Sequence, residues 1–240
     1  RFIVEADGSV LCTGYTMSQD FPVTANAFDT ELGGSRDAFV AKLINDGSGM
    51  AFGTFLGGSS GDTGEGILEG PLGNVYVAGH TYSDNFPIVG PAPFSQHSGN
   101  ADVFVGVLDA SASRLCASTY VGGCNLETVH GFTMPEPGRI AVTGVSWSSD
   151  FPTTGGAFCP EFCGDRDAFA VSLSFTDASA GLGNDLGSPP GARCRVWTTC
   201  PCGTPGGPIF LELDRQNRVR LDVIDIQGRI IAALADGVLS

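Results

Sequence analysis

Short segments in which apolar and polar residues alternate recur through most of the chain. "SVLCTGYT" near the start has counterparts in "NVYVAGHT" and "RIAVTGVS", and each contains a glycine near its end. Alternation over about seven residues is typical of a β-strand that buries one face. We therefore predict strands at 9–16, 37–44, 49–58, 74–81, 102–109, 114–123, 139–146 and 167–174, with further strands beginning at 64–69 and 129–134.

The alternating segments repeat with a period of 65 residues. Gly14, Gly79 and Gly144 share this spacing. The same spacing relates Gly8, Gly73 and Gly138; Phe39, Phe104 and Phe169; and Leu43, Leu108 and Leu173. Each repeat holds about four short strands, and such a unit is too flat to bury both faces unless it stacks on a neighbour. The pattern predicts an all-β chain of three 65-residue repeats, each a β-propeller-type blade of about four antiparallel strands.

One motif, Ser-x-Asp/Asn-Phe-Pro, occurs once in each repeat. Its Phe-Pro pairs are Phe21-Pro22, Phe86-Pro87 and Phe151-Pro152. One interpretation is a ligand site presented by every repeat. The interpretation that we favour is a structural joint, in which Ser and Asp cap backbone N–H groups, Phe packs one unit on the next, and Pro ends the strand pairing.

The string "GNVYVAGHTYSDNFP", followed by "DVFVGVLD" and "LCASTYVGG", resembles the bacterial SBBP repeat, a family named for the seven-bladed β-propeller. The resemblance covers residues 8–173 and implies propeller blades. Three copies are fewer than a closed ring usually needs, and the third copy has no Leu-Gly-Gly strand after Leu173. We expect residues 1–178 to form three blades of an incomplete ring. The remaining blades would come from a longer chain or from associating chains.

The composition changes after residue 178. Residues 179–206 are rich in Gly, Pro and Cys and are predicted to be a linker, whereas alternation returns in 207–240 at "IFLEL", "RVRLDVIDI" and "IIAALADG". This last segment resembles the start of a small Ig-like β-sandwich, as in flagellar hook-capping and type IX secretion sorting domains. The resemblance implies an exported protein at the cell surface.

Charge narrows the choice of partners. The chain has 26 acidic and 12 basic residues, a net charge of −14, and no basic patch. Nucleic acid and anionic membranes are therefore poor partners. No apolar run is long enough for a membrane span. We expect an extracellular or cell-surface protein whose partners are other protein chains or further blades of the same protein, with surface glycans as an additional candidate.

Three carboxylates share the 65-residue spacing: Asp37, Asp102 and Asp167. If they converged near an axis they would form a site for a structural calcium ion, the one cofactor considered. The favoured alternative is that each begins a strand and holds the preceding glycine-rich turn. No other cofactor is expected.

Eight cysteines form an even set that favours an oxidising compartment. Cys159, Cys163, Cys194, Cys200 and Cys202 lie close in sequence, and Cys116 and Cys124 flank one strand. Zinc binding is one interpretation of the cluster, but its spacing differs from two Cys-x-x-Cys pairs. We favour disulfides, with Cys159–Cys163 and Cys116–Cys124 among the candidate pairs.

Catalysis has little support in the sequence. His80, His97 and His130 are not arranged as in known triads, and no nucleophile elbow, phosphate loop or His-Glu-x-x-His motif occurs. We therefore expect a non-enzyme that acts as a structural, adhesive or assembly module. The alternative is a propeller enzyme or carbohydrate-binding subunit whose active residues lie outside this segment.

Overall fold

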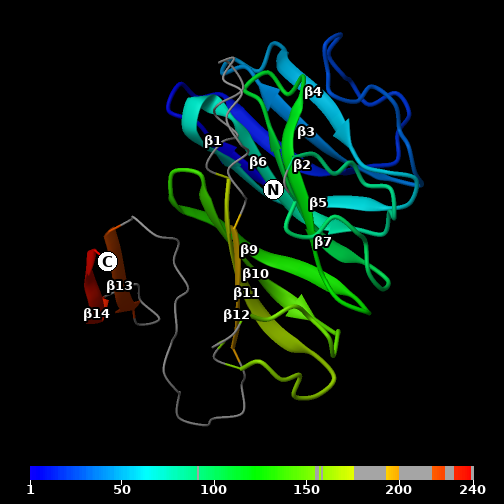
Figure 1. Cartoon of the computed structure of the whole chain (residues 1–240). Helices are drawn as coiled ribbons and strands as arrows, with labels where there is room; N and C mark the ends of the chain where they lie inside the picture. Colours follow the sequence, from blue (N-terminus) through cyan, green and yellow to red (C-terminus); the bar gives the residue numbers. More distant parts are fainter. Residues whose placement is uncertain are drawn as a thin grey trace, which may run out of the picture. The chain divides into compact units, whose positions relative to one another are not determined.

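The computed structural model describes residues 1–90, 92–154, 157 and 159–175, together with the backbone of the strands at 193–199, 218–224 and 230–238. It confirms the predicted all-β class (Figure 1). The chain divides into two compact units, 1–206 and 207–240. Within the described residues, no helix has the length and apolarity needed to cross a membrane.

The first unit contains three four-stranded antiparallel sheets whose strands pair in chain order. Sheet 1 consists of β1 (Phe2–Val4), β2 (Val10–Thr16), β3 (Asp37–Leu43) and β4 (Met50–Leu56). Sheet 2 consists of β5 (Asp62–Glu69), β6 (Val75–Thr81), β7 (Asp102–Leu108) and β8 (Leu115–Val121). Sheet 3 consists of β9 (Glu127–Glu136), β10 (Arg139–Ser146), β11 (Asp167–Ser174) and β12 (Arg193–Thr199).

The turn between the first two strands of each sheet explains one set of repeated glycines. Gly8, Gly73 and Gly138 have φ angles of +87°, +76° and +73°. Residues with a Cβ rarely adopt this left-handed conformation, whereas glycine does so without steric cost. The 65-residue spacing of these glycines therefore marks the same hairpin in all three sheets.

The boundaries of the sheets differ by one strand from the boundaries of the sequence repeats, because the last strand of a repeat is the first strand of the next sheet. Segment 64–69, which follows the predicted strands 9–16, 37–44 and 49–58 in the sequence, lies in β5 and pairs with β6 of sheet 2. Segment 129–134 likewise lies in β9 and pairs with β10 of sheet 3. At the N-terminus, β1 pairs with β2 and is the first strand of sheet 1. The connections at 57–61 and 122–126 carry the chain from one sheet to the next.

Two apolar cores hold the three sheets together. The core between sheets 1 and 2 contains Leu11, Val40, Leu56, Ile67, Val77, Phe104 and Leu108, and the core between sheets 2 and 3 contains Tyr76, Val103, Val105, Val129, Val142, Phe169 and Leu173. Residues of β6 and β7 contribute to both cores, so sheet 2 buries both of its faces. This burial explains why β7 is apolar along almost its entire length.

A repeated stack of rings explains the second set of glycines. Gly79 lies opposite Phe104, and a Cβ added to Gly79 would lie 2.8 Å from that ring. Phe86 stacks on the Phe104 ring, with the two ring centroids 4.4 Å apart. In sheet 3, Phe151 stacks on Phe169 at 4.8 Å. The motif phenylalanine therefore packs on a strand phenylalanine within its own sheet.

The C-terminal strands are described by their backbones. Although residues 179–206 were predicted to be a linker, they include β12, which pairs with β11. The alternating sequence "RCRVWTT" explains this strand, but it lies out of phase with β4 and β8, and the repeat therefore did not predict it. In the second unit, β13 (Arg218–Ile224) and β14 (Ile230–Val238) form an antiparallel pair. The strand predicted at 209–213 lies outside the described residues.

Candidate functional site

Among the described residues of the first unit, buried acidic side chains accept several hydrogen bonds where one sheet is linked to the next. We call joint 1 the residues 33–37, 57–62 and 83–86, and joint 2 the residues 98–102, 122–127 and 148–151. In each joint the connecting segment contacts a turn of the preceding sheet and the Ser-x-Asp/Asn-Phe-Pro motif of the following sheet. The two joints are related by the 65-residue repeat.

Glu127 is the centre of joint 2. Its buried carboxylate accepts hydrogen bonds at Oε1 from the hydroxyls of Ser146 and Ser148, each at 2.6 Å, and at Oε2 from the backbone N–H of Gly123 at 3.1 Å. The hydroxyl of Ser148 in turn accepts the backbone N–H of Asn125 at 2.8 Å. This network fixes the connection between sheets 2 and 3 against the loop that follows β10.

Joint 1 repeats this arrangement with a shorter acid. Asp62 Oδ2 accepts the Ser83 hydroxyl at 2.9 Å and the backbone N–H of Gly58 at 2.8 Å. The Ser83 hydroxyl accepts the backbone N–H of Ser60, as Ser148 does for Asn125. Asn85 accepts the N–H of Ser59 at 2.8 Å, the position at which Asp150 accepts Cys124 N–H at 2.7 Å in joint 2.

Each joint also brings two buried acids around one glycine. A Cβ added to Gly122 would lie 2.1 Å from Asp102 Oδ1 and 2.6 Å from Glu127 Oε2. A Cβ on Gly57 would lie 2.8 Å both from Asp37 Oδ1 and from Asp62 Oδ2. Only a residue without a side chain leaves room for two carboxylates here. The second glycines of the "LGG" and "VGG" ends donate to the same acids, through Gly58 and Gly123.

Burial and the neighbouring acids change the proton affinity of these groups. Burial, followed by the charges of Glu127 and Asp150, raises the pKa of Asp102 to about 7, although the N–H of Ser98 acts in the opposite direction. Burial and the charge of Asp62 also raise the pKa of Asp37. One oxygen of Asp102, Oδ1, is buried without a hydrogen-bond partner. A proton on this carboxyl would remove a buried negative charge beside Glu127.

The three carboxylates considered as calcium ligands each hold the turn that precedes their strand. Asp37 accepts the N–H groups of Gly33 and Gly34, Asp102 accepts that of Ser98, and Asp167 accepts that of Cys163. They lie on three different sheets, and the structure pairs the first two with acids of the next sheet. Among the described residues, no group of three or more His, Cys, Asp or Glu side chains is arranged to hold a metal ion.

The cysteine candidates are distributed over several sites. Cys116 and Cys124 are thiols with separate neighbours, namely the Arg114 carbonyl and the Ser149 hydroxyl. Cys159 and Cys163 are also thiols, with their sulfur atoms 3.8 Å apart. Neither disulfide predicted for this described part is therefore present in the structure. Cys194 lies in β12 opposite Leu173, while Cys200 and Cys202 lie outside the described residues.

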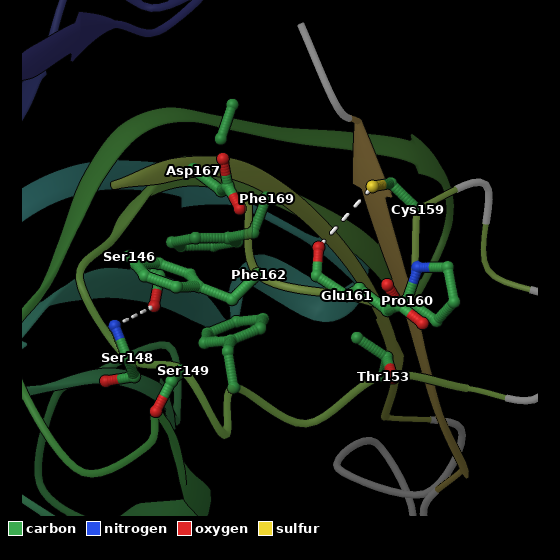
Figure 2. A pocket seen from close by; sticks show the side chains of 12 residues that line it. Ser146, Ser148, Ser149, Thr153, Cys159, Pro160, Glu161, Phe162, Asp167 and Phe169 are labelled. Atoms are coloured by element: carbon green, nitrogen blue, oxygen red, sulfur yellow. Dashed lines mark hydrogen bonds between the residues drawn. The ribbon is translucent and has the colours of Figure 1, made fainter. Parts of the chain in front are cut away.

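A small hollow lies between the loop that contains Cys159 and the adjoining ends of β10 and β11 (Figure 2). The stacked rings of Phe151 and Phe169 form part of its wall, and the Cys159 sulfur contacts the Glu161 carbonyl at its edge. Ser146 and Ser148 also line it, but both hydroxyls donate to Glu127. These two serine hydroxyls are therefore engaged in joint 2.

The histidines lie in three separate environments. His80 contacts Glu65, His97 contacts Asp84 and the Thr81 carbonyl, and His130 contacts Thr128. These contacts link neighbouring strands and loops. Sequence reasoning did not single out Asp62 and Glu127, although both are acidic and 65 residues apart, which is the signal that would have found them.

The repeated polar residues are thus concentrated at the joints, where they attach each sheet to the next. No protein-family model matches the chain, and no curated protein matches it.

Proposed function

We propose that the chain is a structural assembly module, built from β-propeller-type blades, that presents its loops to other protein chains outside the cell. The observation that carries this proposal is the equivalence of the two joints. Residues that recur every 65 positions are used to stack sheets: Asp102 and Glu127 with Gly122 in one joint, and their counterparts in the other. The repeat therefore encodes a means of adding sheets.

The loops are the surfaces that remain for binding. Beyond the shared Ser-x-Asp/Asn-Phe-Pro motif, the segments between the second and third strands of each sheet differ in sequence, while the strands on either side keep the repeat. Variable loops on a rigid sheet scaffold are a common arrangement for recognition.

Self-association of the chain tests the assembly role. Sedimentation velocity of the purified 240-residue chain at increasing concentration is expected to show species larger than the 24.7 kDa monomer. The reason is that a sheet with an uncovered apolar face gains free energy by burying it against another sheet. A single monomeric species from the micromolar range to several hundred micromolar would contradict an assembly role for this segment.

The proposed location outside the cell rests on the cysteines. We expect Cys159 and Cys163 to form a disulfide in an oxidising compartment, because their sulfur atoms are 3.8 Å apart. Their mutual contact raises the pKa of the Cys163 thiol, so oxidation should be faster at alkaline pH, where more thiolate is present. Closing so short a loop should stabilise the fold by roughly 2 kcal/mol.

Mass spectrometry of alkylated peptides from the native host provides the measurement. The 159–163 peptide should resist alkylation until it is reduced. The Cys159→Ser variant, which leaves Cys163 without this partner, is the matched control. A peptide that is fully alkylated without reduction in freshly isolated native protein would contradict the disulfide and weaken the proposed location.

A further inference from the structure

Sheet 1 exposes a face that the other two sheets bury. Leu43 is 40% exposed, whereas its repeat counterparts Leu108 and Leu173 are 0% and 1% exposed. Leu108 lies in the core between sheets 1 and 2, and Leu173 in the core between sheets 2 and 3. Each counterpart thus packs towards the preceding sheet. Leu43 occupies the same position on sheet 1.

The edge strand of sheet 1 shows the same difference. Phe2 is 69% exposed, but its counterpart Ile67 is 4% exposed within the core that faces sheet 1. The next counterpart, Phe132, packs on sheet 2, where a Cβ added to Gly66 would lie 2.6 Å from it. Val4 is 63% exposed, and its counterpart Met134 packs against the core between sheets 2 and 3.

The motif serine of sheet 1 is exposed, whereas the motif serines of sheets 2 and 3 are buried in the joints. Ser83 and Ser148 are fully buried, because each accepts an N–H group of the connection that precedes its sheet. Ser18, which occupies the same motif position in sheet 1, is exposed. Both the apolar and the polar contacts that a preceding sheet makes are therefore available on sheet 1.

Sheet 3 exposes the complementary face. Ala38 and Val103 are 0% and 1% exposed, because each packs towards the following sheet. Their counterpart Ala168 is exposed, and Ala170, in place of buried Val40 and Val105, is partly exposed. Small side chains on this face leave space opposite the large side chains of sheet 1.

We propose that the exposed face of sheet 1, formed by Phe2, Val4, Ser18 and Leu43, binds the Ala168 face of sheet 3 of a second copy of the chain. The interface is head-to-tail and uses the geometry by which the sheets stack within one copy. This inference rests on the proposed assembly function and identifies the surface through which assembly occurs. A head-to-tail interface propagates until it closes into a ring or grows as a filament.

One charged contact between sheets 1 and 2 has an uncharged counterpart at the proposed interface. Between sheets 1 and 2, Lys42 lies near Glu69 of the following sheet, and the charge of Glu69 contributes to raising the pKa of Lys42. At the head-to-tail interface the corresponding positions are Ser172 and Val4. Neither carries a charge, so docking a second copy leaves no ion without its partner at this point. A partner with a different sequence would not place an equivalent residue opposite each of these positions.

Two variants of the full chain, one on each face, test the proposal by sedimentation velocity. Leu43→Asp places a charge on the sheet 1 face, and Ala168→Asp places one on the sheet 3 face. We expect each to raise the apparent dissociation constant at least tenfold. Leu72→Asp is the matched control, because Leu72 is 75% exposed on the turn between β5 and β6 and should leave association unchanged. Circular dichroism verifies the fold. Phe2→Asp replaces Leu43→Asp on the sheet 1 face, and Ala170→Asp replaces Ala168→Asp on the sheet 3 face, if either variant does not fold.

Mixing the two variants makes the test specific. Each retains one intact face, so an equimolar mixture should form 1:1 heterodimers that grow no further. Loss of association in Leu43→Asp but not in Ala168→Asp would overturn the head-to-tail arrangement. Wild-type-like association of both variants would overturn the proposed surface while leaving the assembly function standing. A monomeric wild-type chain would overturn both.

Discussion

Raising the pH from 5 to 8 is expected to lower the free energy of unfolding, because Asp102 loses a proton that the folded state holds. Its folded pKa of about 7 exceeds the ordinary aspartate value of 3.8. The neutral carboxyl therefore stabilises the fold, fully below pH 4, and this contribution disappears as the pH rises through 7. Each tenfold difference in proton affinity corresponds to about 1.4 kcal/mol, so the loss between pH 5 and pH 8 is on the order of 3 kcal/mol.

Other groups also change the stability of the fold with pH, through pKa shifts of their own or through their effect on Asp102. His97, Glu127 and Asp150 influence the carboxyl of Asp102. Asp37 has a raised pKa and adds to the same trend. Interactions that lower the pKa of Asp150 stabilise the fold above pH 4 and are lost at more acidic pH. The window from pH 5 to 8 therefore reports mainly on the carboxyls whose pKa is raised.

Urea denaturation across this pH range, with wild type and Asp102→Asn, gives the measurement. The amide keeps the shape of the side chain and does not titrate, so the variant should lose most of the slope and be the more stable protein at pH 8. The His97→Gln variant removes the side chain that contacts Asp84 and acts to lower the pKa of Asp102. An Asp102→Asn protein that retained the full wild-type slope would contradict proton uptake at this joint.

Replacing Glu127 with alanine is expected to destabilise the first unit by about 4 kcal/mol. The buried carboxylate accepts three hydrogen bonds, two from serine hydroxyls and one from the Gly123 N–H. Truncation leaves these donors buried without partners and opens a cavity, and each unsatisfied donor costs about 1–3 kcal/mol. Glu127→Gln keeps one accepting oxygen and should cost less.

Glu136→Ala on the same strand is the matched control. Its side chain is largely exposed and forms only a surface ion pair with Arg139, which should contribute less than about 1 kcal/mol. Chemical denaturation of the three variants compares them directly. A Glu127→Ala protein as stable as Glu136→Ala would show that the hydrogen bonds of joint 2 do not hold the sheets together.

The strands and their order follow closely from the sequence because the 65-residue repeat aligns alternation, turn glycines and ring stacks in several copies. The division between sheets was harder to predict. Strand β5 follows β4 after five residues, so nothing local in the sequence shows that it pairs forwards with β6. Strand β12 was not predicted for a different reason: it does not follow β8 at the 65-residue spacing that relates β8 to β4.

The joints were predicted only in part. Phe86 and Pro87 indicated a structural turn, but the sequence does not reveal that Asp62 and Glu127 accept the motif serines. An acid that begins a strand is ordinarily exposed, and its burial depends on the neighbouring sheet. The exposed faces of sheets 1 and 3 are likewise tertiary properties, because Leu43 and Leu108 look equivalent in the sequence.

The one-strand offset between sequence repeats and sheets affects how such a protein can change in length during evolution. An in-frame duplication or deletion of one 65-residue period, beginning at any point in the repeats, changes the number of sheets by one. The junction it creates resembles those already present, since the connection, the paired acids and the motif serine are carried together. The number of sheets is therefore a trait that recombination can alter in single steps without the invention of a new interface.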